Sequence, residues 1–160
     1  MLDKKTLETP YRQFFFPLDS VNNWNRIYGV KGFHQYQFVV PLERLDVLES
    51  VLSIIVESGL GSFLAVLKEF GPLSSPGLLS FPRQGWCLAL DFADRGEETV
   101  ELINTINSHI MNAGGAVYPA KDRIMTRETF NLSFPGLPQF LEYKDVAFSS
   151  DLWRRVNGES

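Results

Sequence analysis

The chain has 160 residues, 44% of them hydrophobic and 13% aromatic, which is enough for one globular domain with its own core. The formal net charge is -4 and the basic residues are scattered singly, so the composition argues against a nucleic-acid partner. Cys87 is the only cysteine, which excludes an intrachain disulfide, and one Cys with two His cannot supply the ligands of a structural zinc site. We therefore predict no metal site.

The N-terminal segment combines a polar start with an aromatic stretch. Residues 1–13 contain no apolar core like that of a signal peptide, and no window approaches the ~20 apolar residues that a membrane span needs. We therefore expect a soluble, cytoplasmic protein without a membrane span. The stretch RQFFFP at residues 12–17 places three phenylalanines in a row, and a loop or edge strand that aromatic would normally be covered by something.

A short helix is the first predicted element. Asp19 and Ser20 are suitable N-cap residues for a helix over residues 21–29, which Gly29 would end. Residues 33–40 follow with the period of two that is typical of a strand. Its two predicted faces carry Phe33, Gln35, Gln37 and Val39 on one side and His34, Tyr36, Phe38 and Val40 on the other.

An amphipathic helix is predicted next, over residues 42–58, with Gly59 just past its end. Its apolar stripe is expected to consist of Leu45, Leu48, Leu52 and Ile55, with Val51 and Ile54 beside it. A second strand within residues 61–71 is followed by a loop rich in proline, glycine and serine and by a third strand over residues 86–93.

The second long helix is predicted over residues 97–112, with glutamates in its first turns, where carboxylates favour the helix dipole. Its expected stripe contains Val100, Ile103, Ile106 and Ile110. Gly114 and Gly115 would end it before a short fourth strand at residues 116–118. Residues 126–160 are expected to form two or three short helices broken at Pro135 and Pro138.

The order strand, helix, strand, strand, helix, strand predicts an α+β fold with a ferredoxin-like split βαβ arrangement. In that arrangement an antiparallel sheet carries both long helices on one face, and here a short helical C-terminal tail follows. We find no internal repeat and no linker that would divide the chain. Residues 1–160 are therefore predicted to form a single domain.

Several kinds of site lack support in the sequence. The stretch GLGS at residues 59–62 is too short for a phosphate-binding glycine loop and follows a helix rather than a strand, so we do not expect this chain alone to hold a nucleotide cofactor. Neither His34 nor His109 belongs to a nucleophile motif, and His109 lies within a predicted helix, where a surface or packing role is the simpler interpretation.

Polar residues in apolar surroundings are the better candidates. Gln35 and Gln37 share one strand face, which either faces a ligand or polar network or is simply exposed to water. Lys68 is either a pocket residue or an edge-strand lysine that discourages aggregation. Cys87 on a strand is most simply a small apolar core residue.

Lys121 has two interpretations. It follows Pro119, which fixes the backbone at the exit of the fourth strand, so its positive charge could be presented to an anionic group or a developing oxyanion. Alternatively, Lys121 forms a salt bridge with Asp122 or another nearby acid. The residues alone leave these two readings open.

A series of motifs carries a resemblance to a known family. The motifs, in chain order, are QFFFPLD, NNWNRIYG, GFHQYQFVVP, KEFGP, LSFPRQGWCLALDF, GGAVYPAKDR and TRETF. Together they resemble the C-terminal substrate (cap) domain of FAD-linked oxidoreductases of the vanillyl-alcohol oxidase type, and within it the decaprenylphosphoryl-β-D-ribose 2'-oxidase group. The resemblance runs from about Gln13 to Arg155, and it implies that the FAD-binding domain of such enzymes is absent from this chain.

The resemblance implies roles for individual residues. Lys121 would be catalytic and would contact both flavin and substrate, and Tyr118 would lie near the flavin ring. The implied substrate-binding residues are Gln35, Gln37, Lys68, Phe15 and Cys87. The chain departs from the family pattern in having Cys87 in place of Asn, Ala89 in place of Cys and Phe15 in place of Tyr. These departures bear on the identity of the substrate.

The implied reaction is oxidation of a secondary alcohol of a sugar or polyol, with hydride transfer to flavin N5. A polyprenyl-phosphoryl pentose is one candidate substrate, and another sugar or polyol is equally open. We expect the chain to be a truncated form that is inactive without an FAD-binding domain supplied in cis or in trans, and to self-associate through its exposed flavin-facing surface. The alternative is a stand-alone ferredoxin-like module that binds a small ligand or a partner without catalysis.

Overall fold

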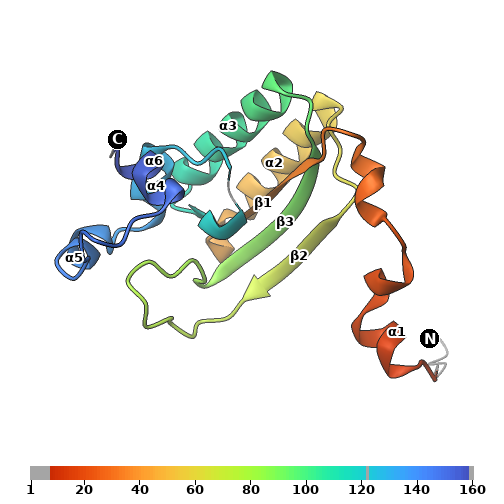
Figure 1. The fold of residues 1–160 in the computed structure, drawn as a ribbon, viewed down its shortest axis with the longest axis horizontal. Helices are drawn as coiled ribbons and strands as arrows, with labels where there is room; N and C mark the ends of the chain where they lie inside the picture. The colour runs from red at the N-terminus through yellow and green to blue at the C-terminus, as the bar shows by residue number, and fades with distance from the viewer. Residues whose placement is uncertain (1–7, 122, 159–160) are drawn as a thin grey trace.

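The computed structural model describes residues 8–121 and 123–158. Its centre is a four-stranded sheet with the order β2-β3-β1-β4 (Figure 1). All three neighbouring pairs are antiparallel. The strands are β1 (Phe33–Val40), β2 (Ala65–Phe70), β3 (Gly85–Ala93) and β4 (Ala116–Val117). The four predicted strands are therefore present, with β2 and β4 shorter than expected.

Helices α2 (Leu45–Ser58) and α3 (Glu97–Asn112) lie side by side against the sheet (Figure 1). A 3-10 turn, η3 (Leu42–Arg44), leads into α2. Tyr36 and Phe38 of β1 point toward this helix layer and are buried in the core. These two residues share one of the two faces that the period of two in the sequence separates, and that face is the one that packs against the helices.

The predicted apolar stripe of α2 was partly wrong. Leu45 and Leu52 are 45% and 42% exposed, respectively. The residues that α2 buries are Val47, Leu48, Val51 and Ile55. Because α2 has apolar residues around much of its circumference, spacings of three and four fit more than one stripe, and only the packing partners select the buried one. In α3 the predicted residues Ile103, Ile106 and Ile110 are buried, whereas Val100 is half-buried.

The segment before β1 differs from the prediction. Residues 24–28 form a 3-10 turn, η2 (Trp24–Tyr28), preceded by Asn23 in the left-handed conformation at φ 56°. Ser20 lies in a separate turn, η1 (Pro17–Ser20), and its hydroxyl donates to the carbonyl of Pro17, so the predicted cap was wrong. Asn adopts the left-handed conformation more readily than most residues, so Asn23 allows the reversal that a continuous helix would have prevented.

An unpredicted short helix, α1 (Tyr11–Phe15), lies at the N-terminal end, far from the sheet in Figure 1. The C-terminal helices gather at the opposite end of the molecule (Figure 1). They are α4 (Arg127–Ser133), α5 (Leu137–Leu141) and α6 (Asp151–Asn157). Pro135 separates α4 from α5 as predicted, but Pro138 lies in the first turn of α5, where its missing N–H costs no hydrogen bond. None of the described helices has both the length and the hydrophobicity of a membrane-spanning segment.

Candidate functional site

The sheet has a second face, opposite the layer of α2 and α3, which we call the open face. The open face is formed by alternate residues of the three longer strands, because residues paired across antiparallel strands point to the same side. Gln35 pairs with Asp91 and Gln37 with Ala89, and Lys68 of β2 pairs with Cys87. The strand register therefore brings together four of the predicted substrate-binding residues, Gln35, Gln37, Lys68 and Cys87.

Gln37 and Cys87 form a buried contact on the open face. Gln37 is 6% exposed and its Nε2 donates to the Cys87 Sγ at 3.1 Å. Burial raises the pKa of the Cys87 thiol, and the hydrogen bond from Gln37 and the charge of Lys68 oppose that shift. Cys87 is thus buried, as a core residue would be, but on the face away from the helices. The contact also leaves the Gln37 side-chain oxygen as the group that can accept from a ligand.

Gln35 and Lys121 meet at the end of the same face. The backbone N–H of Tyr118 donates to the carbonyl of Gln37 at 2.8 Å, which extends the alignment of β4 with β1 beyond the strand itself. The 3-10 turn η4 (Pro119–Lys121) follows at once, and the Lys121 Nζ donates to Gln35 Oε1 at 3.4 Å. Gln35 is exposed. Gln35 of β1 and Lys121 at the exit of β4 were both predicted to face a ligand. They lie next to each other.

The alternative interpretation of Lys121 is a salt bridge with Asp122 or another nearby acid. Asp122 lies outside the described residues. Among the acidic residues that the structure does describe, none forms an ion pair with Lys121. The Lys121 side chain hydrogen-bonds to Gln35.

Lys68 fits both of its sequence interpretations. It lies on β2, an edge strand of the sheet, and is exposed to solvent. Its Nζ lies 5.5 Å from the centre of the Phe70 ring, within the range of a cation–π contact. Because Lys68 pairs with Cys87, its side chain also belongs to the open face.

Aromatic rings border the open face near Lys121. The ring centres of Tyr118 and Phe81 are 4.8 Å apart, and those of Phe81 and Phe70 are 6.1 Å apart. Phe81 comes from the loop between β2 and β3 and is buried. This row gives the open face an apolar border beside the cationic side chains.

Phe15 is the predicted site residue that the structure does not bring to this group. It lies on α1, is 60% exposed and packs against Tyr11 and Phe14, with ring centres 4.8 and 4.9 Å away. Figure 1 shows α1 well away from the strands. The aromatic segment thus packs on itself, and the three phenylalanines remain about half exposed or more. Their packing against an FAD-binding domain, which the resemblance implies, stays a prediction.

Asp91 is a residue of the open face that our sequence interpretation overlooked. It is 3% exposed and accepts a hydrogen bond from the Tyr28 hydroxyl at 3.0 Å. Burial, together with the hydrogen bond and the charge of Asp91, raises the pKa of Tyr28 to about 12. The ring of Tyr28 stacks on Phe33 with centres 4.3 Å apart. The signal was present in WCLALDFA, because alternation puts Asp91 on the same face as Cys87.

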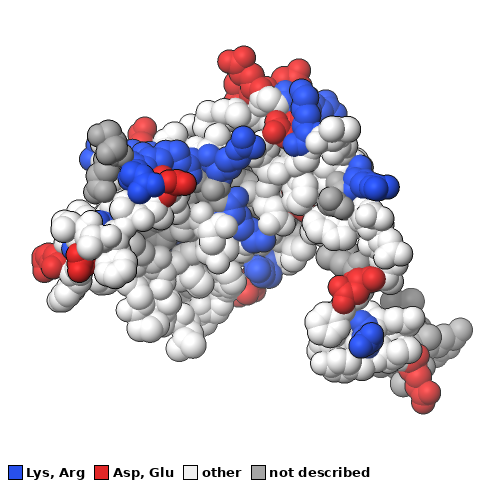
Figure 2. Space-filling model, in the orientation of Figure 1, with Lys and Arg blue, Asp and Glu red and all other residues white. Residues whose placement is uncertain are grey.

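The two histidines, His34 and His109, lie away from the open face. His34 belongs to the helix-facing side of β1, and its Nε2 lies 3.5 Å from the Asp94 carboxylate. A backbone hydrogen bond from Gly96 is the first cause that lowers the pKa of Asp94, and His34 adds to it. His109 is exposed on α3. In Figure 2 Lys and Arg side chains form a band over the C-terminal helices, with an acidic side chain against it, while large areas of the visible face are uncharged.

The chain is similar to known proteins over most of its length. No protein-family model matches the chain. Decaprenylphosphoryl-beta-D-ribose oxidase of Mycolicibacterium smegmatis is 39% identical over 149 residues, which cover 90% of this chain and 32% of that protein. A Streptomyces coelicolor protein described as "Uncharacterized protein in mprA 5'region" is 33% identical over 116 residues, which cover 69% of this chain and 31% of that protein.

The chain therefore spans about a third of the length of the curated relatives it matches. The match to the oxidase extends over nearly all of the chain, so it includes the strands and turns that form the open face. The resemblance inferred from the motifs is confirmed: this chain is homologous to a region that makes up about one third of decaprenylphosphoryl-beta-D-ribose oxidase.

Proposed function

We propose that this chain is the substrate-binding domain of an FAD-dependent oxidoreductase that oxidises a secondary alcohol of a sugar or polyol. The observation that carries the proposal is the grouping of Gln35, Gln37, Lys68, Cys87 and Lys121 on one sheet face, from four separate segments. The homology to an oxidase over nearly the whole chain supports the same reading.

The proposal also includes the topology of the sheet and its helices. We infer a ferredoxin-like split βαβ sandwich. The inference is supported by the chain order β1, α2, β2, β3, α3, β4 and by the sheet order β2-β3-β1-β4 with antiparallel pairing. In such an arrangement the helices protect one face of the sheet, which leaves the other face free for a ligand or a second domain.

The open face fits a flavin by its chemistry. It combines the aromatic ring of Tyr118, the cation of Lys121 and the buried amide of Gln37 within one sheet surface. Tyr118 and Lys121 are the residues that would contact the cofactor. When bound, FAD supplies the acceptor that takes the carbinol hydrogen as hydride. We propose that a second domain, in cis or in trans, carries most of the FAD contacts, so this chain alone is expected to be inactive.

The residues of this chain would act by binding and orientation. Lys121 would place a positive charge where negative charge develops on the substrate oxygen, and Gln35 would hold that ammonium in position. Gln37 is anchored through its nitrogen on Cys87, so its oxygen can accept from a substrate hydroxyl. Lys68 would meet an anionic group of the substrate from the edge strand.

A polyprenyl-phosphoryl pentose is one substrate in this proposal, since the mycolicibacterial relative is named for such a compound. An apolar cavity of about 190 Å³ lies beside Pro119 and is lined by Leu79, Phe134 and Trp153 among others. Pro119 belongs to the same turn as Lys121, so an apolar substituent could extend from the open face toward this cavity. Another sugar or polyol that lacks the lipid would leave the cavity unused.

A stand-alone interaction module is the second candidate. The exposed edge of β2, where Leu67 is 54% exposed, and the exposed rings of α1 favour it. Such a module needs neither a flavin nor Lys121.

Titration with FAD separates the two candidates. The chain is mixed with FAD alone and with FAD plus an FAD-binding domain of the vanillyl-alcohol oxidase type, and the flavin absorption spectrum is recorded. We expect no shift with the chain alone and a saturable shift when both domains are present. Stoichiometric binding of FAD by the chain alone would overturn the proposed division between domains. No effect of the chain on the flavin of the second domain would favour the interaction module.

A further inference from the structure

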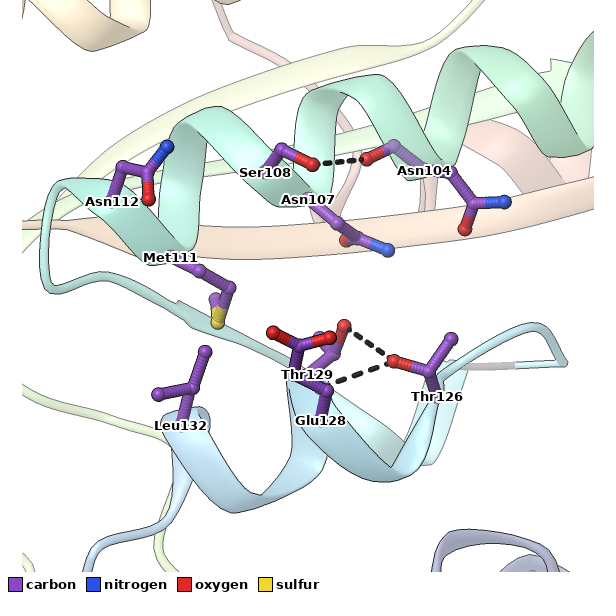
Figure 3. A pocket seen from close by; sticks show the side chains of 9 residues that line it. All are labelled: Asn104, Asn107, Ser108, Met111, Asn112, Thr126, Glu128, Thr129 and Leu132. Carbon is purple, nitrogen blue, oxygen red and sulfur yellow. Dashed lines mark hydrogen bonds between the residues drawn. The ribbon is translucent and has the colours of Figure 1, made fainter.

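A groove between α3 and α4 lies on the side of β1 opposite the open face. It has a volume of about 350 Å³ and lies outside the site described above (Figure 3). Amide side chains of α3, including Asn104 and Asn107, approach it from one side. Glu128 and Thr129 of α4 lie on the other side. Two elements that are distant in the sequence therefore build one polar groove.

Asn107 presents an oriented hydrogen-bond donor to the groove. It is 6% exposed, and its Oδ1 accepts from the Tyr36 hydroxyl at 2.6 Å. That bond fixes the amide so that Nδ2 is directed toward the space between α3 and α4, as Figure 3 shows. Among the described residues no buried side-chain nitrogen or oxygen lacks a hydrogen-bond partner, so Nδ2, for which no described acceptor is present, opens onto the groove and can donate to a ligand or water there.

The other lining groups restrict what the ligand can be. Glu128 contributes a carboxylate, which accepts from hydroxyl groups, while Met111 and Leu132 provide an apolar side. The hydroxyls of Thr126 and Thr129 already bond to each other at 3.0 Å, so they stabilise the start of α4 rather than remain free. None of the residues that line the groove is Lys or Arg. The groove is therefore unsuited to a phosphate or another anion.

We propose that this groove is a second binding site, for a small neutral sugar or polyol without a phosphoryl group. Neighbouring hydroxyls of such a molecule can accept from Asn107 and donate to Glu128, while its C–H groups lie against Met111. The site is independent of the flavin chemistry proposed for the open face. It is nevertheless linked to that face through Tyr36, because Tyr36 bonds to Asn107 and stands between Gln35 and Gln37 on β1.

The test is an NMR titration of the ¹⁵N-labelled chain with D-ribose and with ribitol, and separately with ribose 5-phosphate. We expect saturable shifts of the Asn107 side-chain NH₂ and of the amides of α4 with the two neutral probes. Binding of ribose 5-phosphate at these positions should be at least about tenfold weaker, equivalent to about 1.4 kcal/mol, because its charge meets Glu128 and no cation. Linear shifts without saturation, or shifts confined to the open face, would overturn the proposal.

Variants assign the binding to the groove. Asn107→Asp keeps the oxygen that accepts from Tyr36 but replaces the donor, and Glu128→Gln removes the carboxylate from an exposed position. Each should weaken ribitol binding by about threefold to thirtyfold, the loss expected for one hydrogen bond. Glu49→Gln makes the same charge change on an exposed position of α2 and should leave the affinity unchanged. Because Glu128 is exposed, its variant tests the site even if Asn107→Asp fails to fold; unchanged binding in Glu128→Gln would contradict the proposal.

Discussion

Lys121 and Gln35 are 86 positions apart in the sequence, yet the Lys121 Nζ donates to Gln35 Oε1 at 3.4 Å. The contact depends on the alignment of β4 with β1, where Val117 pairs with Phe38 and the N–H of Tyr118 donates to Gln37. The short fourth strand is thus the element that brings the lysine to the open face. Changes that disturb this strand should affect the site as well as the fold.

Gly115 tests the placement of that strand. A Cβ added at Gly115 would lie 2.5 Å from the carbonyl oxygen of Val39 and 2.6 Å from a side-chain carbon of Ile110. We expect Gly115→Ala to lower the free energy of unfolding by about 1 to 3 kcal/mol in urea denaturation, because β4 must move away from β1 and α3. Gly61→Ala is the control, since nothing lies within 4 Å of its added Cβ. Equal effects of the two changes would contradict the tight packing of β4.

The thiol of Cys87 reports on the open face. Because burial raises its pKa, alkylation by iodoacetamide should be slow near neutral pH and should become faster only above about 8.5, the ordinary thiol pKa. The charge of Lys68 opposes the shift, so Lys68→Met should slow alkylation further, whereas Lys31→Met at another exposed position should not. Equal alkylation rates in Lys68→Met and the unmodified chain would count against the placement of Lys68 beside Cys87.

Tyr28 and Asp91 give a prediction about pH. The pKa of Tyr28 is raised from 10.0 to about 12, so between these values the folded chain holds a proton that the unfolded chain has lost. Stability should therefore fall as the pH rises through this window, and the contribution of Tyr28 is roughly 2 to 3 kcal/mol when the whole window is crossed. Urea denaturation from pH 7 to pH 11 should show part of this loss in the unmodified chain and a smaller loss in Tyr28→Phe.

At neutral pH Tyr28→Phe should lower the free energy of unfolding by about 1 to 3 kcal/mol relative to the unmodified chain, because the buried Asp91 carboxylate loses a hydrogen-bond donor. Tyr143→Phe is the matched control, since Tyr143 is 74% exposed. A Tyr28→Phe chain with unchanged stability at neutral pH and an unchanged slope at high pH would show that the Tyr28–Asp91 bond is not formed.

Exposed rings near the N-terminus should promote self-association. Phe14 and Phe15 are 68% and 60% exposed. We expect light scattering at high concentration to show oligomers, and the double variant Phe14→Ser and Phe15→Ser to shift the chain toward a monomer. Phe148→Ser changes another ring, 77% exposed near the C-terminus, and serves as the control. A monomeric unmodified chain would contradict this prediction.

The sequence predicted the positions of the helices and strands better than the contacts that their side chains make. Both long helices and all four strands follow from periodicity and from glycine positions, because the hydrophobic pattern of each is strong. The buried side of α2 was misassigned at Leu45 and Leu52, since only the packing against α3 and β1 decides among several apolar stripes. The turn at Asn23 was missed because its left-handed backbone interrupts a pattern that otherwise suits a helix.

The candidate site, too, was predicted only in part from the sequence. Alternation put Gln35 and Gln37 on one face, and the family resemblance gave roles to Lys68, Cys87 and Lys121, whose interpretation the residues alone had left open. The strand register that joins these residues comes only from the structure. The different burial of the two glutamines was also beyond the sequence, because it depends on Cys87 from another strand. Asp91 could have been found from its place in β3, whereas the groove at Asn107 required the packing of α4 on α3.

The proposed role of Lys121 and the open face in substrate oxidation is tested most directly with a chimera. This chain replaces the matching third of the Mycolicibacterium smegmatis oxidase, and oxidation of decaprenylphosphoryl ribose is measured with and without Lys121→Met. We predict an active chimera, a loss of about a hundredfold or more in kcat on Lys121→Met, as for removal of one group that stabilises developing charge, and an unchanged Tm. A folded chimera in which Lys121→Met retains full activity would contradict the role given to the open face.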